Sequence, residues 1–215
     1  MFSAIVTCHN SDPNPIIRML RRQTLPPDEI LVETSGECAR IEEPVNHWDH
    51  VPDEHDYGYR KRNRMAQFAK GKWLGFFNHD DSYHPRYIEL MRALIGEHDI
   101  VYCDWSTIPQ NCTWERAVST VGNFIVHREK FLEVGGFPTL AEDEGHADAR
   151  FIEATADVPH IHLPAILYYH NVPYAQHIKP TYWGNQQDYD DDVTYSKWKH
   201  VTDQQLKAMM EATDA

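Results

Sequence analysis

The chain has 215 residues and a formal net charge of −13, from 33 Asp and Glu against 20 Lys and Arg. Hydrophobic residues make up 41% of it, which provides enough apolar side chains for a core and excludes a globally disordered chain. The acidic excess disfavours a nucleic-acid backbone as partner, because phosphate contacts need clustered Lys and Arg, and no stretch approaches the roughly 18 uncharged apolar residues of a membrane span.

The beginning of the chain predicts a strand–helix–strand unit. Residues 2–8 (FSAIVTC) are apolar and β-branched and predict a buried strand, which runs into a turn-rich segment. Ile16, Met19 and Leu20 have the spacing of a helical face, and residues 28–36 (DEILVETSG) predict a second strand. Because the unit takes about 30 residues, its strands are expected to be parallel.

The rest of the chain continues this alternation. The polar segment 37–58 is of the long, irregular kind that often carries function. The pattern then predicts helices at 62–71, 85–96, 129–137, 148–157 and 202–213, and strands at 72–78, 99–105, 121–128 and 160–170. The interpretation is one α/β domain over residues 1–172, with a mostly parallel central sheet flanked by helices. Residues 173–215 are expected to form a C-terminal extension packed on the same domain.

The cysteines and the N-terminus favour a cytoplasmic protein. Cys8, Cys38, Cys103 and Cys112 form no CxxC pair, so reduced thiols are expected rather than a disulfide framework or a zinc site. The opening residues MFSAIVTCHN lack the basic region of a signal peptide and reach polar residues early.

Two adjacent carboxylates, Asp80 and Asp81, follow the strand predicted at 72–78. Ligands of open α/β sheets bind beyond the carboxyl ends of the strands. Hard oxygen ligands, completed by substrate phosphates and water, suit Mn²⁺ or Mg²⁺. Taken alone, the pair is equally compatible with a polar loop. Residues 60–72 (RKRNRMAQFAKGK) add a basic cluster without an acidic residue, which indicates one local anionic ligand inside an acidic protein.

Five segments in order carry a family resemblance. Residues 62–85 contain R-N-x₅-A-x-G, a strand and then N-H-D-D-x-x-x-P. With 5–10 (IVTCHN), 21–32 (RRQTLPPDEILV), 122–137 (GNFIVHREKFLEVGGF) and 163–170 (LPAILYYH), this order resembles the family 2 glycosyltransferases of the GT-A fold, over about residues 2–172.

The resemblance implies a nucleoside-diphosphate sugar as donor and inversion at the transferred sugar. The acceptor would be a hydroxyl on a glycan, a lipid-linked intermediate, a protein or a modified base. It also implies a divalent cation, Mn²⁺ or Mg²⁺, on Asp80 and Asp81, with His170 as a third ligand. Arg62, or its neighbours Arg60 and Lys61, would contact the phosphates. Asn78 stands where the family usually has the first Asp of D-x-D, and would hydrogen-bond a ribose hydroxyl.

For the nucleobase, the resemblance points to Thr7 and His9, and Asn10 and Ser35 are expected among the other donor-binding residues. Thr34 and Ser35 stand where the family usually has an Asp pair, so the Asp that commonly reads uracil is absent unless Glu33 replaces it.

The base that deprotonates the acceptor hydroxyl is expected just after the G-G-F segment. Asp148 has the right interval to the last strand and opens a helix, whose N-terminus favours an anion. Asp143, in the Glu142–Asp143 pair, is the alternative, and Asp148 as a simple helix cap is another. Two other functions remain open: a nucleotidyltransferase that releases pyrophosphate, and a binding module for sugar nucleotides or carbohydrates without catalysis.

Overall fold

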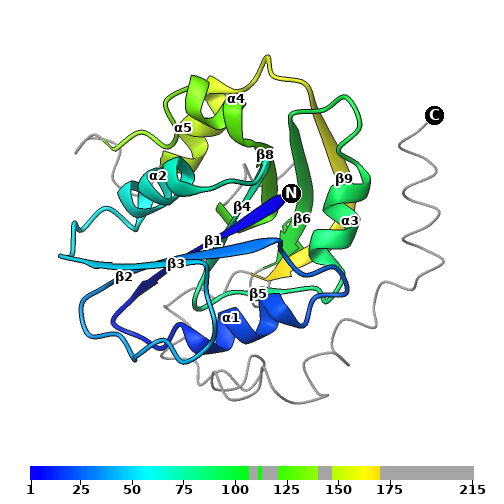
Figure 1. Cartoon of the computed structure of the whole chain (residues 1–215). Coiled ribbons are helices and arrows are strands. Elements are labelled where there is room, and N and C mark those ends of the chain that lie inside the picture. Colours follow the sequence, from blue (N-terminus) through cyan, green and yellow to red (C-terminus); the bar gives the residue numbers. More distant parts are fainter. Residues whose placement is uncertain (107–110, 113–120, 140–146, 170–215) are drawn as a thin grey trace.

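The structure is a computed structural model that describes residues 1–106, 111–112, 121–139 and 147–169 (Figure 1). The strands are β1 (Phe2–His9), β2 (Glu29–Ser35), β3 (His47–Val51), β4 (Trp73–Asn78), β5 (Ser82–Tyr83), β6 (Ile100–Ser106), β7 (Asn111–Cys112), β8 (Phe124–His127) and β9 (His160–Tyr169). The helices are α1 (Asn14–Arg21), α2 (Tyr59–Phe68), α3 (Tyr87–Ala93), α4 (Arg128–Glu133) and α5 (Ala147–Ala154), with a 3₁₀ turn at Val121–Asn123.

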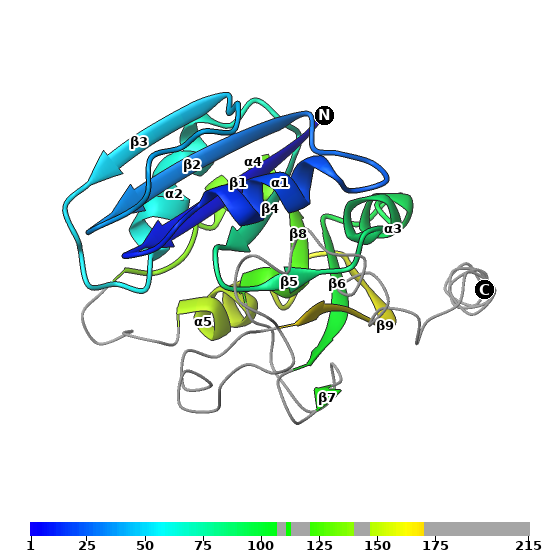
Figure 2. The ribbon, with the colours of Figure 1, turned by 90° about the horizontal axis from the view of Figure 1, so that it is seen from below.

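The first half of the sheet is parallel. The strand order is β3-β2-β1-β4-β8-β6-β9-β5, with β7 on β6. β1 pairs in parallel with both β2 and β4, and β2 pairs in parallel with β3. The arrowheads of β1, β2 and β3 therefore point the same way (Figure 2). This arrangement confirms the predicted strand–helix–strand unit and brings the carboxyl ends of β1, β2 and β4 to one edge.

The second half of the sheet is mixed. β8 lies antiparallel between β4 and β6, while β6 and β9 are parallel. The predicted α/β domain with a helix-flanked central sheet is confirmed, and the antiparallel pairs refine its description. A short apolar run such as Phe124–His127 packs equally well in either direction, so the hydrophobic pattern alone does not encode strand direction.

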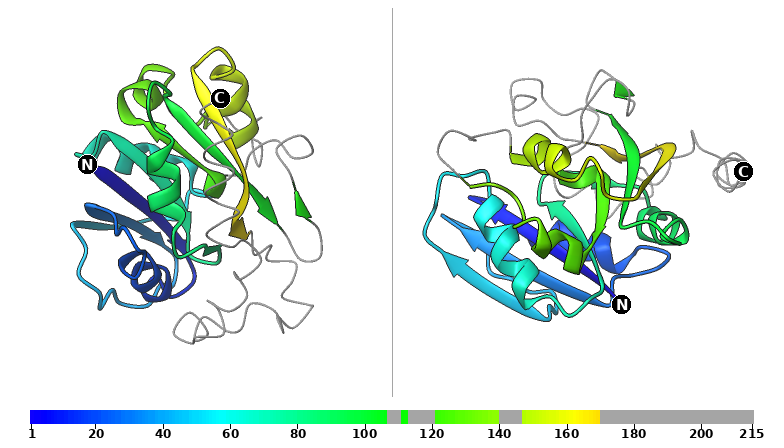
Figure 3. Two further views of the ribbon diagram at one scale, coloured as in Figure 1. Left: turned by 90° about the vertical axis from the view of Figure 1, so that its right-hand side faces the viewer. Right: turned by 90° about the horizontal axis from the view of Figure 1, so that it is seen from above.

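Helices cover both faces of the sheet because its strands are apolar on both sides. α1 and α3 pack on one face with Val6 and Phe77, whereas α2, α4 and α5 pack on the other with Ile5 and Phe76. Figure 3 shows the second group of helices from above. Neighbouring residues of one strand thus enter opposite layers, as the two-residue period of a strand requires. Burying each such Phe contributes roughly 1.5–3 kcal/mol.

α2 begins earlier than the sequence pattern predicts. The helical spacing in the predicted helix 62–71 puts Met65, Phe68 and Ala69 on one face, but Phe68 is 56% exposed while the other two are buried. The helix starts after Gly58, whose φ of +81° allows the sharp entry. Its buried face is formed by Tyr59, Arg62, Met65 and their neighbours. The charged side chains of Lys61 and Arg62 are thereby buried in α2.

The predicted extension at 173–215 and its helix at 202–213 lie outside the described residues. Within the described ranges, the helices are all too short or too polar to cross a lipid bilayer.

Candidate active site

Polar side chains gather where β1, β2 and β4 end. Thr7 of β1 lies opposite Asn78 of β4, and His9 lies opposite Ser35 of β2. The imidazole Nδ1 of His9 is 3.0 Å from Ser35 Oγ, and its Nε2 is 2.7 Å from Asn10 Nδ2. The structure therefore brings together five residues that the sequence assigned to donor binding.

A close contact between two loops shapes this end of the site. Asn10 has a φ of +49°, and its Oδ1 accepts a hydrogen bond of 2.7 Å from the backbone N–H of Glu37. Gly36, at φ +68°, passes so near that a Cβ there would lie 2.1 Å from Asn10 Oδ1. Gly36 is thus required both by its backbone angle and by the lack of space.

Arg62 enters the site from α2. It is 4% exposed, its Nη1 donates to the Tyr57 carbonyl at 2.8 Å, and its Nη2 donates to Asn78 Oδ1. Its guanidinium carbon lies 5.4 Å from the centre of the Tyr59 ring, within cation–π range. The Nε atom of Arg62 is buried and has no hydrogen-bond acceptor among the described residues. A buried guanidinium N–H without an acceptor is suited to an anionic ligand.

Asn78 links Arg62 to a buried carboxylate. Its Nδ2 donates to Asp81 Oδ2 at 2.5 Å, and the same oxygen accepts the Tyr168 hydroxyl at 2.7 Å. An amide can serve Arg62 with its oxygen and Asp81 with its nitrogen, which a carboxylate cannot do. The departure from the family's usual Asp at this position therefore has a structural reason.

The two adjacent carboxylates occupy different environments. Asp81 is fully buried and turned toward Asn78 and Tyr168. The Asp80 side chain is 30% exposed and lies 4.0 Å from His79 Nδ1. Its charge also contributes to the raised pKa of the Cys8 thiol, whose main cause is burial. Asp80 is thus the more exposed carboxylate of the pair at the end of β4.

Asp148 lies in the first turn of α5, where its Oδ1 accepts the backbone N–H of Ala149 at 2.9 Å. Burial raises the pKa of the Asp148 carboxyl, and the Ala149 N–H, the Arg62 charge and the Tyr59 hydroxyl oppose this only in part. Burial likewise raises the pKa of Tyr59 to about 12, so its hydroxyl stays protonated and can donate to Asp148. A carboxylate with a raised pKa is a better proton acceptor near neutral pH. Asp143 and His170 lie outside the described residues.

Glu33 is engaged on the α2 side of the sheet. It is fully buried, its Oε1 accepts Arg64 Nε at 2.8 Å, and Arg64 also binds Glu54 at 2.7–2.9 Å. Burial raises the pKa of Glu33 against the effect of Arg64. Sequence reasoning missed this triad, as it missed Tyr59 and Tyr168, because the partners are far apart in the chain.

The ligands available for a cation suit Mn²⁺ or Mg²⁺. In the part of the chain that the structure describes, no group of three or more His, Cys, Asp or Glu side chains is placed to hold a metal ion. Mg²⁺ is commonly held by one or two carboxylates together with substrate phosphates and water. Asp80, a partly exposed carboxylate in the turn after β4, fits this second mode.

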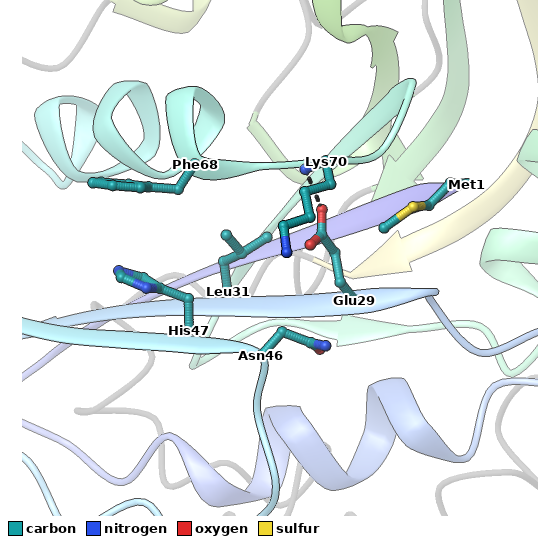
Figure 4. A pocket seen from close by; sticks show the side chains of 7 residues that line it. All are labelled: Met1, Glu29, Leu31, Asn46, His47, Phe68 and Lys70. Carbon is teal, nitrogen blue, oxygen red and sulfur yellow. Dashed lines mark hydrogen bonds between the residues drawn. The ribbon is translucent and has the colours of Figure 1, made fainter.

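A separate cavity of about 310 Å³ lies at the opposite end of the strands (Figure 4). Its lining residues are Met1, Glu29, Leu31, Asn46, His47, Phe68 and Lys70. The His47 and Phe68 rings stack there at 4.8 Å, and Glu29 Oε1 accepts the backbone N–H of Lys70 at 2.5 Å. The Glu29 carboxylate is therefore engaged in joining β2 to the end of α2.

A model of the family described as "Glycosyl transferase family 2" matches residues 3–147. The chain belongs to glycosyl transferase family 2. This membership confirms the resemblance inferred from the five ordered segments. A comparison with curated proteins found no match.

Solved structures share the fold of this chain. S. aureus TarS is similar over 83% of this chain, with 18% sequence identity and a TM-score of 0.61, and the match covers 38% of the TarS chain. A shorter form of TarS in complex with UDP-GlcNAc matches with 17% identity and a TM-score of 0.60, over 84% of this chain and 61% of that one. The present chain thus spans less than two thirds of these TarS chains, and at this identity the likeness concerns the fold alone.

Proposed function

We propose that the chain transfers a sugar from a nucleoside-diphosphate sugar to an acceptor hydroxyl, with Mn²⁺ or Mg²⁺ and with inversion at the anomeric carbon. The observation that carries this proposal is the chain of hydrogen bonds from Arg62 through Asn78 to Asp81, together with Asp148, whose carboxyl feels the charge of Arg62. One site thereby combines the guanidinium of Arg62, which would contact the pyrophosphate, with the carboxylate of Asp148, which would accept the hydroxyl proton. The UDP-GlcNAc complex of TarS supports a nucleotide-sugar donor.

The donor's pyrophosphate would lie between Asp80 and Arg62. Asp80 would hold the metal ion, because its side chain is partly exposed at the end of β4 whereas Asp81 is fully buried. When bound, a divalent cation neutralises charge on the departing nucleoside diphosphate. Arg62 acts on the same charge from the protein side, since a phosphate oxygen would satisfy its Nε. Asn78 and Asp81 position the Arg62 guanidinium for this contact.

Asp148 is the proposed base. The acceptor oxygen forms its bond to the anomeric carbon, the bond from that carbon to the phosphate oxygen breaks, and the hydroxyl proton moves to Asp148. Tyr59 orients the carboxylate by donating a hydrogen bond. Because Asp148 must be ionised to accept the proton, we expect transfer to fall at low pH, starting above the usual Asp range owing to its raised pKa.

Two variants test the assignment. We expect Asp148→Asn to lower kcat by about 10²–10⁴-fold while nucleoside-diphosphate affinity is kept. Asp80→Ala is expected to abolish both metal-dependent donor binding and transfer. Glu153→Gln on the exposed side of α5 and Asp157→Ala, also exposed, are the matched controls. Full transfer in Asp148→Asn or Asp80→Ala would contradict the respective role.

Product analysis separates this function from its rivals. A glycosyltransferase releases a nucleoside diphosphate and leaves the sugar on the acceptor, whereas a nucleotidyltransferase releases pyrophosphate. NMR of the new glycosidic bond reports inversion or retention. Donor binding without hydrolysis or transfer, across metals and acceptors, would indicate a binding module instead.

A further inference from the structure

The segment 52–58, between β3 and α2, holds two bulky side chains in a disfavoured backbone conformation. His55 and Tyr57 have φ angles of +52° and +55°, followed by Gly58 at +81°. Only glycine adopts such angles without a penalty, so a Tyr there is uncommon. Residues kept in this region cluster at ligand sites, where the surrounding structure maintains them.

Several polar contacts hold the segment over the site. Glu54 binds Arg64 of α2, and Asp53 lies 3.7 Å from His9 Nε2 at the end of β1. Asp56 accepts the backbone N–H groups of Gly58 at 3.0 Å and of Arg60 at 2.6 Å. The backbone angle of Tyr57 is therefore imposed by its neighbours on both sides, and none of these contacts uses the Tyr57 ring.

Tyr57 stands at the nucleobase end of the site. Its carbonyl accepts Arg62 Nη1, and a Cβ on the next residue, Gly58, would lie 3.4 Å from Thr7 Oγ1. Since consecutive Cα atoms are about 3.8 Å apart, the Cα atom of Tyr57 lies about that distance from the Cα atom of Gly58, the residue next to Thr7 in space. The residue is 71% exposed. A large, solvent-exposed ring thus belongs to a residue whose backbone contacts Arg62 and whose chain neighbour Gly58 lies against Thr7.

The two positions of β2 where the family usually has the base-reading Asp pair do not provide a carboxylate here. Thr34 and Ser35 carry no charge, and Glu33 is buried against Arg64. What the site does offer is a flat aromatic surface, and stacking on such a surface is tolerant of base identity because every base has a π-face.

We propose that Tyr57 is a donor-binding residue that stacks on the nucleobase. The proposal rests on the proposed function and deepens it by assigning how the base is held. It also accounts for an aromatic residue at a position where glycine would be more stable.

The experiment compares two glycine variants of the same segment. Tyr57→Gly and His55→Gly each relieve a positive φ, but only the first removes the proposed stacking ring. Dissociation constants are measured by calorimetry for uridine, guanosine and adenosine diphosphates and for inorganic pyrophosphate, all with Mn²⁺. Thermal unfolding of both variants checks that neither is misfolded.

We expect Tyr57→Gly to bind all three nucleoside diphosphates about 5- to 100-fold more weakly. Pyrophosphate binding, which needs no base contact, should change less than twofold. His55→Gly should match the wild type for every probe, and Tyr57→Phe should keep most of the affinity. Both glycine variants should unfold at or above the wild-type temperature.

The failures are distinguishable. Wild-type affinity in Tyr57→Gly, an equal loss in His55→Gly, or an equal loss for pyrophosphate would each overturn the role of Tyr57 while leaving the proposed function intact. If the wild type binds none of the nucleoside diphosphates, the proposed function itself fails, and the role of Tyr57 fails with it.

Discussion

Replacing Asn78 by Asp, the residue usual in the family, should destabilise this protein. The change removes the 2.5 Å hydrogen bond from Asn78 Nδ2 to Asp81 Oδ2. It also puts a second carboxylate in contact with that of Asp81, which is fully buried. Two unit charges ~3 Å apart at an effective dielectric constant of ~20 repel by about 5.5 kcal/mol. Arg62 contacts position 78 from the other side, and its attraction to the new carboxylate offsets a similar amount of this repulsion.

What remains is the loss of a donor to a buried carboxylate, which costs about 1–3 kcal/mol. A proton on the new carboxyl would restore a donor to Asp81, so the pKa of that carboxyl should be raised and a proton should be bound in the folded variant at a pH where the unfolded chain has released it. The stability deficit of Asn78→Asp should therefore be largest at pH 8 and shrink toward pH 5.

Urea unfolding of wild type and Asn78→Asp at pH 8 and pH 5 measures both quantities. Asn78→Ser, which is uncharged, controls for the loss of the amide and should show a deficit that depends less on pH. A variant as stable as the wild type at pH 8, or a deficit that grows toward pH 5, would refute the reasoning.

Two further predictions concern the frame of the site. Arg64→Met leaves Glu33 buried without its cation and should cost about 3–5 kcal/mol, because an uncompensated buried charge is expensive. Since burial raises the pKa of Glu33, this cost should diminish as the pH falls through that raised pKa, and a pH-independent loss in chemical denaturation would count against it. Gly36→Ala places a Cβ 2.1 Å from Asn10 Oδ1, whereas a Cβ at Gly96, also at positive φ, meets nothing within 4 Å. Gly36→Ala should therefore lower thermal stability by about 1–3 kcal/mol more than Gly96→Ala, and equal losses would show that the loop contact does not matter.

Much of the fold could be predicted from hydrophobic pattern and turn residues. The alternation of apolar runs with Gly and Pro placed the parallel unit of β1, α1 and β2, and the position of Asp80 after a buried strand placed it at the ligand edge of the sheet. These features are local, because they depend on residues a few positions apart. The family followed from the order of five such segments.

The remaining features depend on contacts between distant residues. Tyr168 donates to Asp81 from 87 positions away, and Arg64 meets Glu33 across 31. No spacing rule links such pairs, so the sequence could not show that Asp81 is fully buried while Asp80 is partly exposed. The antiparallel direction of β8 and the exposure of Phe68 likewise arise from packing. The roles of Asp80 and Asp148 in metal binding and proton transfer stay predictions.

The bridge between Arg62, Asn78 and Asp81 has a consequence for how substitutions at this site combine. Positions 78 and 81 together carry one negative charge, that of Asp81. The neutral amide of Asn78 connects this carboxylate to Arg62 through two hydrogen bonds. A gain of charge at position 78 alone, or a loss of charge at position 81 alone, changes the total charge beside Arg62. Exchanging Asn and Asp between the two positions keeps that total charge. We therefore expect the stability effects of substitutions at positions 78 and 81 to be non-additive, as for other residues in direct contact.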